Sequence, residues 1–362
     1  MAGNTLRVGV VGVGFGVAVH VPAFRAEGWE VTAICARTPE KVAATAKDHE
    51  VPYVFTDFHD LVASDQVDAV AIVTPPIAHA EATLAAIGAG KHVLCEKPFA
   101  MNISEAKAMR DAAIAEGVTA MIAHEFRYTP QRLHAKDLMT QGYVGQPGTV
   151  YAQANFALGR PGGPAPMTWQ ANLADGGGAL GALGSHFLDS MRWWVGDITA
   201  VSAHLATLRP DRIDAATGAT LKADGDDTFT INLRFANGAV GALAYTATAP
   251  VQLGAQITIS GTEGVLSLPQ AGVNPTTREV VWAGRGGDAQ VEQLPMPEQF
   301  QALPDDRDRR IPAFRRLVRD FTQGIRDGNS PSPNFDDGVA VQAILDAARE
   351  SSATGREVEI RA

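Results

Sequence analysis

Cysteine, positive charge and long hydrophobic runs are all scarce in this sequence of 362 residues. Its two cysteines, Cys35 and Cys95, fall in apolar, strand-like runs, so we expect buried free thiols rather than a disulfide. The formal net charge of −10 disfavours a nucleic-acid-binding surface, because phosphate backbones attract clustered positive charge. No apolar run is long enough to span a membrane, and the N-terminus shows no secretory signal pattern. We therefore expect a cytoplasmic protein whose partners are neither nucleic acids nor membranes.

Near the N-terminus, a short apolar run ends in a cluster of glycines and is followed by a predicted helix. A strand, a glycine turn and a helix N-terminus together form an anion site, because the backbone N–H groups and the positive helix end point at a phosphate. The third position of the pattern G-x-G-x-x-G is Val17, and Gly16 comes one residue early. The turn predicts a dinucleotide site, although a glycine-rich turn without a ligand has the same local pattern. The candidate cofactor residues here are Gly12, Gly14, Phe15, Gly16 and Val17.

The first 125 residues alternate between strand and helix patterns, which predicts a parallel sheet covered by helices on both faces. One helix has a capping signal, with Asn102 three residues before Glu105. The predicted strands are Leu6–Val11, Glu30–Ala36, Ala69–Thr74, His92–Cys95 and Thr119–Ile122. The predicted helices are Val19–Ala26, Pro39–Asp48, Ile77–Ala89 and Ser104–Glu116.

Strand patterns dominate from residue 148 to about 282 and predict a mostly antiparallel sheet. Asn237-Gly238 between two strand runs is a strong hairpin signal. A long glycine-rich helix is expected over Ala179–Val195, and two more helices, Pro312–Gly324 and Asp337–Ser351, close the chain. The change of pattern predicts a domain boundary near residue 125.

The end of the second predicted strand bears on the choice of cofactor. An enzyme that prefers NAD usually has an acidic residue here, whereas this chain has Ala36 followed by Arg37 and Thr38, with Lys41 one turn later. A guanidinium suits a 2′-phosphate, which a carboxylate would repel. We therefore favour NADP, with NAD possible; the alternative is an arginine on a solvated loop.

Two further strands end in polar residues at the same predicted edge of the sheet. The third strand runs into Thr74, Pro75 and Pro76, and His79 follows as either a cofactor contact or a structural hydrogen-bonding residue. Next in the chain come Glu96 and Lys97. Stiff backbone would hold Lys97 near the ligand edge as a donor to a substrate oxygen, although a surface lysine is the default reading.

Together these features resemble the Gfo/Idh/MocA family, the group of glucose–fructose oxidoreductase and inositol dehydrogenase. The resemblance covers essentially the whole chain. The residues that carry it are the glycine turn, Thr74-Pro75 with His79, Glu96-Lys97-Pro98, Gly176-Gly177-Gly178 leading to His186, and the closing pattern of Asp337-Gly338, Ala347, Ser351 and Gly355-Arg356. It implies an α/β fold with a Rossmann domain over residues 1–125. An α/β domain for substrate binding and oligomerisation, with an open, mostly antiparallel sheet, would follow over residues 126–362.

The resemblance also implies an activity, namely hydride transfer between NAD(P) and a hydroxyl carbon of a sugar, polyol or sugar derivative. Lys97 matches the catalytic lysine of the family, and His186 matches its usual proton acceptor. A homodimer or homotetramer is implied as well. The alternatives are a dinucleotide- or sugar-sensing protein without turnover, and a lyase or glycosidase that keeps its NAD(P) bound. Because His20 and His204 lack metal-ligand spacing, we expect no metal.

One departure concerns the surroundings of His186. Many family members carry an aspartate four residues earlier, where this chain has Ala182. The loss leaves His186 without its usual carboxylate partner, which would orient the imidazole and raise its basicity. Asp189 or Glu125 could replace it, although Asp189 could instead pair with Arg192.

The segment from His124 to Pro130 resembles the family's interdomain segment, which often has an asparagine at the position of Glu125. Arg127 is a candidate contact to cofactor or substrate. Glu125 could bind a substrate hydroxyl or pair with Lys97 or Arg127; a structural salt bridge at the domain boundary is the alternative. Thr168, Trp169 and Asn172 could supply polar contacts and a ring face to a sugar, although Trp169 could equally be buried.

Overall fold

The computed structural model describes residues 5–157, 165–270 and 280–361, and the chain forms two compact units. Unit 1 comprises Met1–Tyr128 and Ala302–Gln342, and unit 2 comprises Thr129–Gln301 and Ala343–Ala362. The predicted boundary near residue 125 coincides with the change from a parallel to a mostly antiparallel sheet. Unit 1 differs from the contiguous division in also containing a segment from late in the chain.

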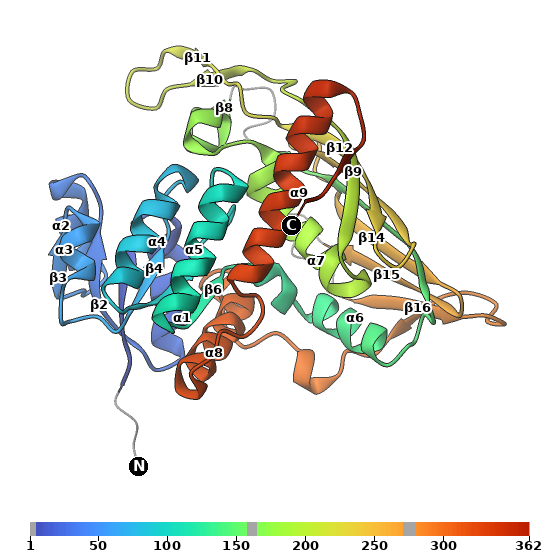
Figure 1. Ribbon diagram of the computed structural model, residues 1–362, viewed down its shortest axis with the longest axis horizontal. Coiled ribbons are helices and arrows are strands. Elements are labelled where there is room, and N and C mark those ends of the chain that lie inside the picture. Colours follow the sequence, from blue (N-terminus) through green and yellow to red (C-terminus); the bar gives the residue numbers. More distant parts are fainter. Residues whose placement is uncertain (1–4, 158–164, 271–279, 362) are drawn as a thin grey trace. The chain divides into compact units, whose positions relative to one another are not determined.

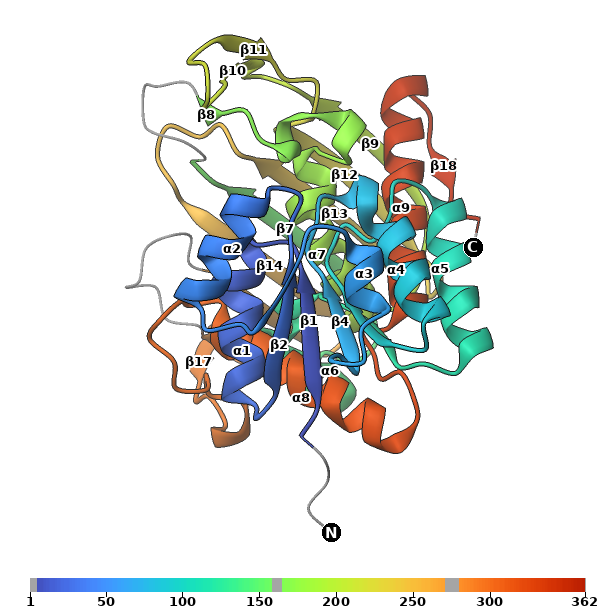
Figure 2. The same cartoon turned by 90° about the vertical axis from the view of Figure 1, so that its left-hand side faces the viewer.

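The sheet of unit 1 has six parallel strands in the order β3-β2-β1-β4-β5-β6. This is the order of a Rossmann sheet, which binds its ligands at the carboxyl ends of the strands. Strands β4 and β5 carry almost entirely buried side chains, in agreement with a sheet covered on both faces. Figure 2 shows β2, β1 and β4 side by side. The strands are β1 (Arg7–Val11), β2 (Glu30–Cys35), β3 (Tyr53–Phe55), β4 (Ala69–Ile72), β5 (His92–Cys95) and β6 (Ala120–Ile122).

The four helices predicted for the first 125 residues are all present. Two of them begin with a turn that is not α-helical: a wider, π-helical turn comes before α1, and a tighter, 3-10 turn comes before α4. Asn102 caps α5 as predicted, because its Oδ1 accepts the backbone N–H of Glu105 at 3.0 Å. Helices α4 and α5 pack side by side (Figure 1). The elements are η1 (Gly16–His20), α1 (Val21–Ala26), α2 (Pro39–Asp48), α3 (Phe58–Val62), η2 (Pro76–Ala78), α4 (His79–Gly88), α5 (Ile103–Glu116) and η3 (Glu125–Tyr128).

Helix α8 (Ile311–Asp327) joins the late segment to unit 1. The rings of Trp29 and Phe321 stack with their centroids 5.8 Å apart, and Trp29 Nε1 donates to Thr322 Oγ1 at 2.8 Å. These contacts join residues far apart in sequence, so no local pattern could have predicted them. Both cysteines, Cys35 in β2 and Cys95 in β5, are buried in this unit as expected.

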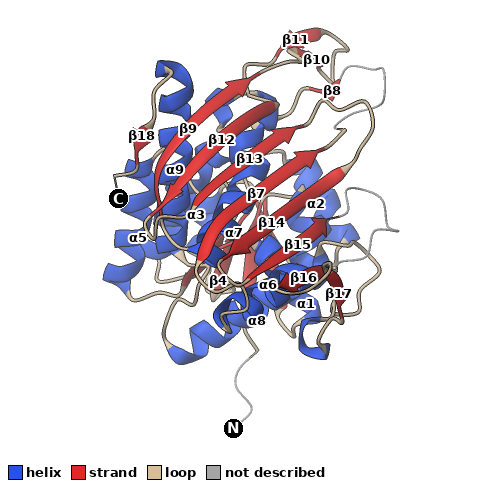
Figure 3. Cartoon of the chain, turned by 90° about the vertical axis from the view of Figure 1, so that its right-hand side faces the viewer, coloured by secondary structure: helices blue, strands red, loops and turns tan. Residues whose placement is uncertain are grey.

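Unit 2 is built on a nine-stranded sheet in the order β17-β16-β15-β14-β7-β13-β12-β9-β18 (Figure 3). Strands β13 and β7 pair in parallel, and the other neighbours are antiparallel. The predicted hairpin at Asn237-Gly238 joins β12 to β13, and Gly238 has a φ of +88°. The strands are β7 (Pro147–Asn155), β9 (Ile198–Ala206), β12 (Thr228–Phe235), β13 (Val240–Thr246), β14 (Gly254–Gly261), β15 (Gly264–Gln270), β16 (Val281–Arg285), β17 (Glu292–Leu294) and β18 (Val358–Glu359).

Side chains alternate between buried and exposed along this sheet, as they do in β12. Helices α6 and α7 pack on one face. The opposite face is toward the viewer in Figure 3. By the strand register, Tyr151, Val240 and Trp282 share this face, and their large apolar side chains are exposed. A small sheet of β8 (Ala165–Pro166), β10 (Asp211–Ile213) and β11 (Thr220–Lys222) also belongs to this unit. Its helical elements are α6 (Pro130–Thr140), η4 (Trp169–Ala171), η5 (Leu173–Asp175), η6 (Leu180–Gly184), α7 (Ser185–Val195) and η7 (Glu298–Phe300), and α9 (Phe335–Thr354) contributes its later residues.

No helix in the described ranges is both long and apolar enough to cross a membrane.

Candidate functional site

The glycine turn after β1 leaves an open cradle. Gly12 has a φ of +115°, and a Cβ there would lie 2.3 Å from the Val73 carbonyl oxygen, so only glycine fits. A Cβ at Gly14, by contrast, would meet no atom within 4 Å. The turn is therefore closed against the end of β4 and open above Gly14, as the backbone approach of a pyrophosphate requires.

Gly16 supplies the close contact between helix and strand that the third glycine of the pattern usually makes. A Cβ at Gly16 would lie 2.8 Å from Val10 Cγ1 of β1. The first turn of the following helix is π-helical and accommodates one residue more than an α-helical turn. This wider turn gives a physical reason for the glycine at position 16, with a partly buried Val17 after it.

The candidate residues for the adenosine side follow β2, next to the glycine turn. The Gly12 N–H donates to the Cys35 carbonyl at 2.9 Å, which fixes the end of β2 beside the turn. Ala36 is partly buried, and Arg37, Thr38 and Lys41 are exposed. A cationic side chain is thus accessible where a 2′-phosphate would be recognised.

His79 makes contacts of the structural kind. Its side chain is fully buried, with Nε2 2.8 Å from the Thr74 carbonyl oxygen and Nδ1 3.3 Å from that of Phe99. Burial lowers the pKa of His79, so the imidazole is neutral. It links the end of β4 to the loop after β5, while Thr74 and Pro75 are partly buried and Pro76 is buried.

Lys97 lies at the end of β5 beside a buried carboxylate. The Oε1 atom of Glu96 is 2.9 Å from His20 Nε2, and its Oε2 accepts the Lys97 backbone N–H at 3.2 Å and lies 3.9 Å from Lys97 Nζ. Burial would raise the pKa of Glu96, but the His20 hydrogen bond and the charge of Lys97 lower it. Glu96 therefore remains ionised and fixes the backbone from which Lys97 extends.

Sequence reasoning missed His20, which it considered only as a metal ligand. The signal was its spacing, because His20 comes four residues after Gly16 on the helix that faces the edge of the sheet. No group of three or more His, Cys, Asp or Glu side chains in the described part of the chain could hold a metal ion.

Glu125 is a second buried carboxyl group in the same cluster. It begins η3 directly after β6 and is 4% exposed. Burial and the charge of Glu96 raise the pKa of Glu125 to about 8, while Lys97 and Arg310 act in the opposite direction. Near pH 7, Glu96 is therefore a carboxylate and Glu125 a carboxylic acid, which is the division that acid–base sites use.

Arg127 lies in a buried ion pair within unit 1. Its Nη2 is 3.1 Å from Asp337 Oδ1, and its Nη1 donates to Ser332 Oγ at 2.7 Å. Burial would raise the pKa of Asp337, but Arg127 and the hydrogen bonds from Ser332 and Asn334 lower it to about 2. Asp337 is a partner for Arg127 that the sequence did not suggest.

In unit 2, the predicted helix around His186 begins with the π-helical η6 and continues as α7. His186 is 1% exposed, and its carbonyl oxygen accepts from Arg132 Nη1 at 3.2 Å and from Ser190 Oγ at 2.8 Å. Asp189 is buried in the same helix, and Arg192 pairs with Asp197 at 2.8 Å. The backbone at His186 is thus fixed by side chains from two helices.

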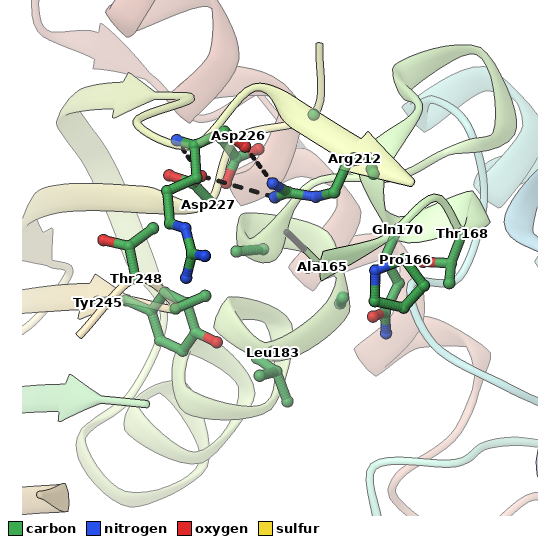
Figure 4. A pocket seen from close by; sticks show the side chains of 16 residues that line it. Ala165, Pro166, Thr168, Gln170, Leu183, Arg212, Asp226, Asp227, Tyr245 and Thr248 are labelled. Atoms are coloured by element: carbon green, nitrogen blue, oxygen red, sulfur yellow. Dashed lines mark hydrogen bonds and ion pairs between the residues drawn. The ribbon is translucent and has the colours of Figure 1, made fainter. Parts of the chain in front are cut away.

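A cavity of about 190 Å³ lies within unit 2 beside Ala182 (Figure 4). Ala182 and Leu183 of η6 line it, and Tyr245 of β13 contributes a buried hydroxyl for which the described residues offer no hydrogen-bond partner. Burial raises the pKa of Asp226, another lining residue, to about 6. The small side chain of Ala182 therefore borders space that a polar ligand could use.

The three candidate residues before this helix have different surroundings. Thr168 lines the cavity. Asn172 caps η5, accepting the Ala174 N–H at 3.1 Å, and its Nδ2 donates to Asp175 at 2.9 Å. Trp169 is partly buried, so it is neither a fully exposed ring face for a sugar nor a fully buried core residue.

Comparisons with known proteins agree with this geometry. Residues 6–124 match the oxidoreductase family with an NAD-binding Rossmann fold, and residues 136–360 match its C-terminal alpha/beta domain. The chain is 32% identical to levoglucosan dehydrogenase of Pseudarthrobacter phenanthrenivorans, covering 99% of this chain and 98% of the relative. It is 28% identical to D-xylose 1-dehydrogenase (NADP(+)) 2 of Haloferax volcanii, covering 98% and 100%.

A solved structure of levoglucosan dehydrogenase in complex with NADH has a TM-score of 0.89 and 29% identity, covering 99% of this chain and 100% of that chain. Both family models match, in chain order, the parts that the sequence predicted. The resemblance is therefore confirmed, and the chain belongs to the Gfo/Idh/MocA oxidoreductase family.

Proposed function

We propose that this protein is a dehydrogenase that transfers a hydride between a nicotinamide dinucleotide and a hydroxyl carbon of a sugar, polyol or sugar derivative. The observation that carries the proposal is the position of Lys97 at the ligand edge of a Rossmann sheet, with its Nζ 3.9 Å from the buried carboxyl group of Glu96. The pKa of Glu96 is lowered and that of the buried Glu125 is raised, which supports acid–base chemistry in this region. The names of the relatives, levoglucosan and D-xylose dehydrogenases, support a carbohydrate substrate.

The residues of unit 1 suit the dinucleotide. The open space at Gly14 and the backbone of the glycine turn would hold the pyrophosphate, and the residues after β2 would hold the adenosine ribose. When bound, the nicotinamide supplies the carbon that donates or accepts the hydride. We favour NADP because Arg37 and Lys41 are exposed cations where an NAD enzyme would place a carboxylate.

Within this proposal Lys97 and His186 divide the proton chemistry. Lys97 donates a hydrogen bond to the oxygen that develops negative charge, and the bond from its backbone N–H to Glu96 fixes the backbone from which the side chain extends. His186 accepts the hydroxyl proton in the oxidative direction. The cavity beside Ala182 would take part of the substrate, with the Tyr245 hydroxyl as a polar contact.

The test is a turnover screen with NADP and NAD against sugars, polyols and their oxidised counterparts, followed by nicotinamide absorbance. We expect turnover on at least one substrate, faster with NADP. Faster turnover with NAD would contradict the cofactor preference alone. Dinucleotide binding without turnover across the panel would contradict the dehydrogenase and favour the sensing protein, which the missing carboxylate at Ala182 would suit. Dinucleotide that co-purifies and does not exchange would favour a lyase or glycosidase.

A further inference from the structure

Arg310 stands over the ring of Phe15, a residue of the glycine turn of unit 1, although it comes from the late segment of the chain. Its guanidinium carbon lies 4.9 Å from the centroid of the Phe15 ring. Phe15 directly follows Gly14, above which the turn is open. The side chain of Arg310 is 44% exposed, so it is accessible to a ligand.

Helix α8 holds Arg310 in this position. Arg310 is the residue before α8, and the ring of Phe314 in the first turn of α8 lies 4.2 Å from the His20 ring, centroid to centroid. Phe314 also contacts Phe15 at 6.5 Å in an edge-to-face arrangement. Two helices thus begin near Phe15, the one after the glycine turn and α8, and both present positive ends in this region.

A carboxylate orients the guanidinium without using all of its donors. Arg310 Nε donates to Asp308 Oδ1 at 2.9 Å and Nη2 donates to Asp308 Oδ2 at 2.6 Å. Among the described residues Nη1 has no hydrogen-bond acceptor. The negative charges of Glu125 and Glu96 add to the effect of Asp308 in raising the pKa of Arg310.

We propose that Arg310 is a cofactor-binding residue, whose guanidinium, carried on Phe15 and oriented by Asp308, binds the pyrophosphate of the dinucleotide held by the glycine turn. The inference rests on the proposed function and adds to it a residue from outside the Rossmann sequence motif. A guanidinium suits this ligand because it gives charge-assisted hydrogen bonds to phosphate oxygens in a fixed planar geometry.

The chain contains a matched control. Arg307 repeats the arrangement two residues after an aspartate, with Nε donating to Asp305 Oδ1 at 2.9 Å and Nη2 to Asp305 Oδ2 at 2.5 Å. Its side chain is 52% exposed. In the described structure no aromatic ring lies beneath its guanidinium, so Arg307→Gln removes the same type of pair without touching the glycine turn.

The experiment is calorimetric binding of NADP and of 2′-phospho-ADP-ribose to the full-length protein. The second ligand keeps the pyrophosphate and the 2′-phosphate of NADP but lacks the nicotinamide. We expect Arg310→Gln to weaken both ligands by roughly 10- to 100-fold, the scale of a lost charge-assisted bond, and to reduce the salt dependence of affinity. Arg310→Lys should lie between Arg310→Gln and the unmodified protein, and Arg307→Gln should bind normally. Thermal unfolding of each variant separates lost contacts from lost folding.

Equal affinities of Arg310→Gln and Arg307→Gln would overturn the inference and leave the proposed function standing. Weaker NADP binding with unchanged 2′-phospho-ADP-ribose binding would also overturn it, because the contact would then be to the nicotinamide. If the unmodified protein binds neither ligand, the proposed function fails and the inference fails with it.

Discussion

Two identical side chains near Lys97 differ in their protonation because their neighbours differ. Glu96 has His20 and Lys97 as partners, whereas Glu125 is buried and faces the charge of Glu96. The sequence marked Lys97 and Glu125 as candidates through the strand ends that they follow. The sequence could not predict the protonation of Glu96 and Glu125, because it depends on burial and on His20, which a π-helical turn brings to Glu96.

Glu125 should make stability depend on pH. The carboxyl has a pKa near 4.5 when unperturbed and about 8 in the folded chain, so the folded state keeps a proton that the unfolded state loses. Between these values the free energy of unfolding therefore falls as pH rises, by at most about 1.4 kcal/mol per pH unit. Glu125→Gln should remove this contribution, so that its stability relative to the unmodified protein increases from pH 5 to pH 8 in urea unfolding.

The control for this prediction is Glu116→Gln, since Glu116 is exposed at the end of α5. It should keep the pH dependence of the unmodified protein. A Glu125→Gln curve parallel to that of the unmodified protein would mean that Glu125 is ionised in the folded chain.

At the scale of elements, local patterns predicted the parallel strands and their helices because burial on both faces leaves a continuous apolar signal. They did not predict β3, which has three residues, two of them exposed, or the three-stranded sheet of β8, β10 and β11. They also missed that α8 packs in unit 1, since Trp29 and Phe321 meet only in the folded chain.

The ion pair between Arg127 and Asp337 should contribute strongly to the stability with which the late segment of the chain packs in unit 1. It joins η3 to the start of α9 within unit 1, and Arg127 is only 2% exposed. Arg127→Leu leaves a buried carboxylate without its main partner, which costs about 3–5 kcal/mol in the free energy of unfolding. The pKa of Asp337 is about 2 when folded against 3.8 when unperturbed, so its contribution is present above pH 4 and lost as pH falls toward 2.

Urea unfolding at neutral pH provides the measurement. The double variant Arg127→Leu/Asp337→Leu should recover much of the loss, because neither charge then remains buried. A loss below about 1 kcal/mol in Arg127→Leu, typical of a surface pair, would contradict a structural role for this bond.

At the scale of the whole molecule, one face of the nine-stranded sheet lacks a cover within the described chain. Tyr151, Val240 and Trp282 are 49%, 45% and 37% exposed on it. We propose that this face forms the contact of a dimer or tetramer, because an uncovered sheet face with exposed aromatic and aliphatic side chains among polar ones suits association with another copy. Strand patterns predicted a mostly antiparallel sheet, but no pattern in one chain reveals how many copies assemble.

Charge on this face should therefore break the assembly. We expect Tyr151→Lys/Val240→Lys to sediment as a monomer where the unmodified protein sediments as an oligomer, since unpaired charges are costly to bury. Ile114→Lys is the control, because Ile114 is 68% exposed on α5 in unit 1 and lies outside this face. An unchanged sedimentation coefficient in the double variant would exclude this face as the contact.

The account depends most directly on Lys97, and the measurement that tests it is kcat of Lys97→Met beside that of Lys91→Met. Lys91 precedes the opposite end of β5, where its Nζ donates to the carbonyl oxygens of Ser64 and Val67. With the best substrate from the screen, Lys97→Met should lose roughly two orders of magnitude or more in kcat, and Lys91→Met should stay close to the unmodified protein. Turnover of Lys97→Met within about threefold of the unmodified enzyme would contradict the proposed chemistry, because a donor that stabilises the transition state contributes far more than that.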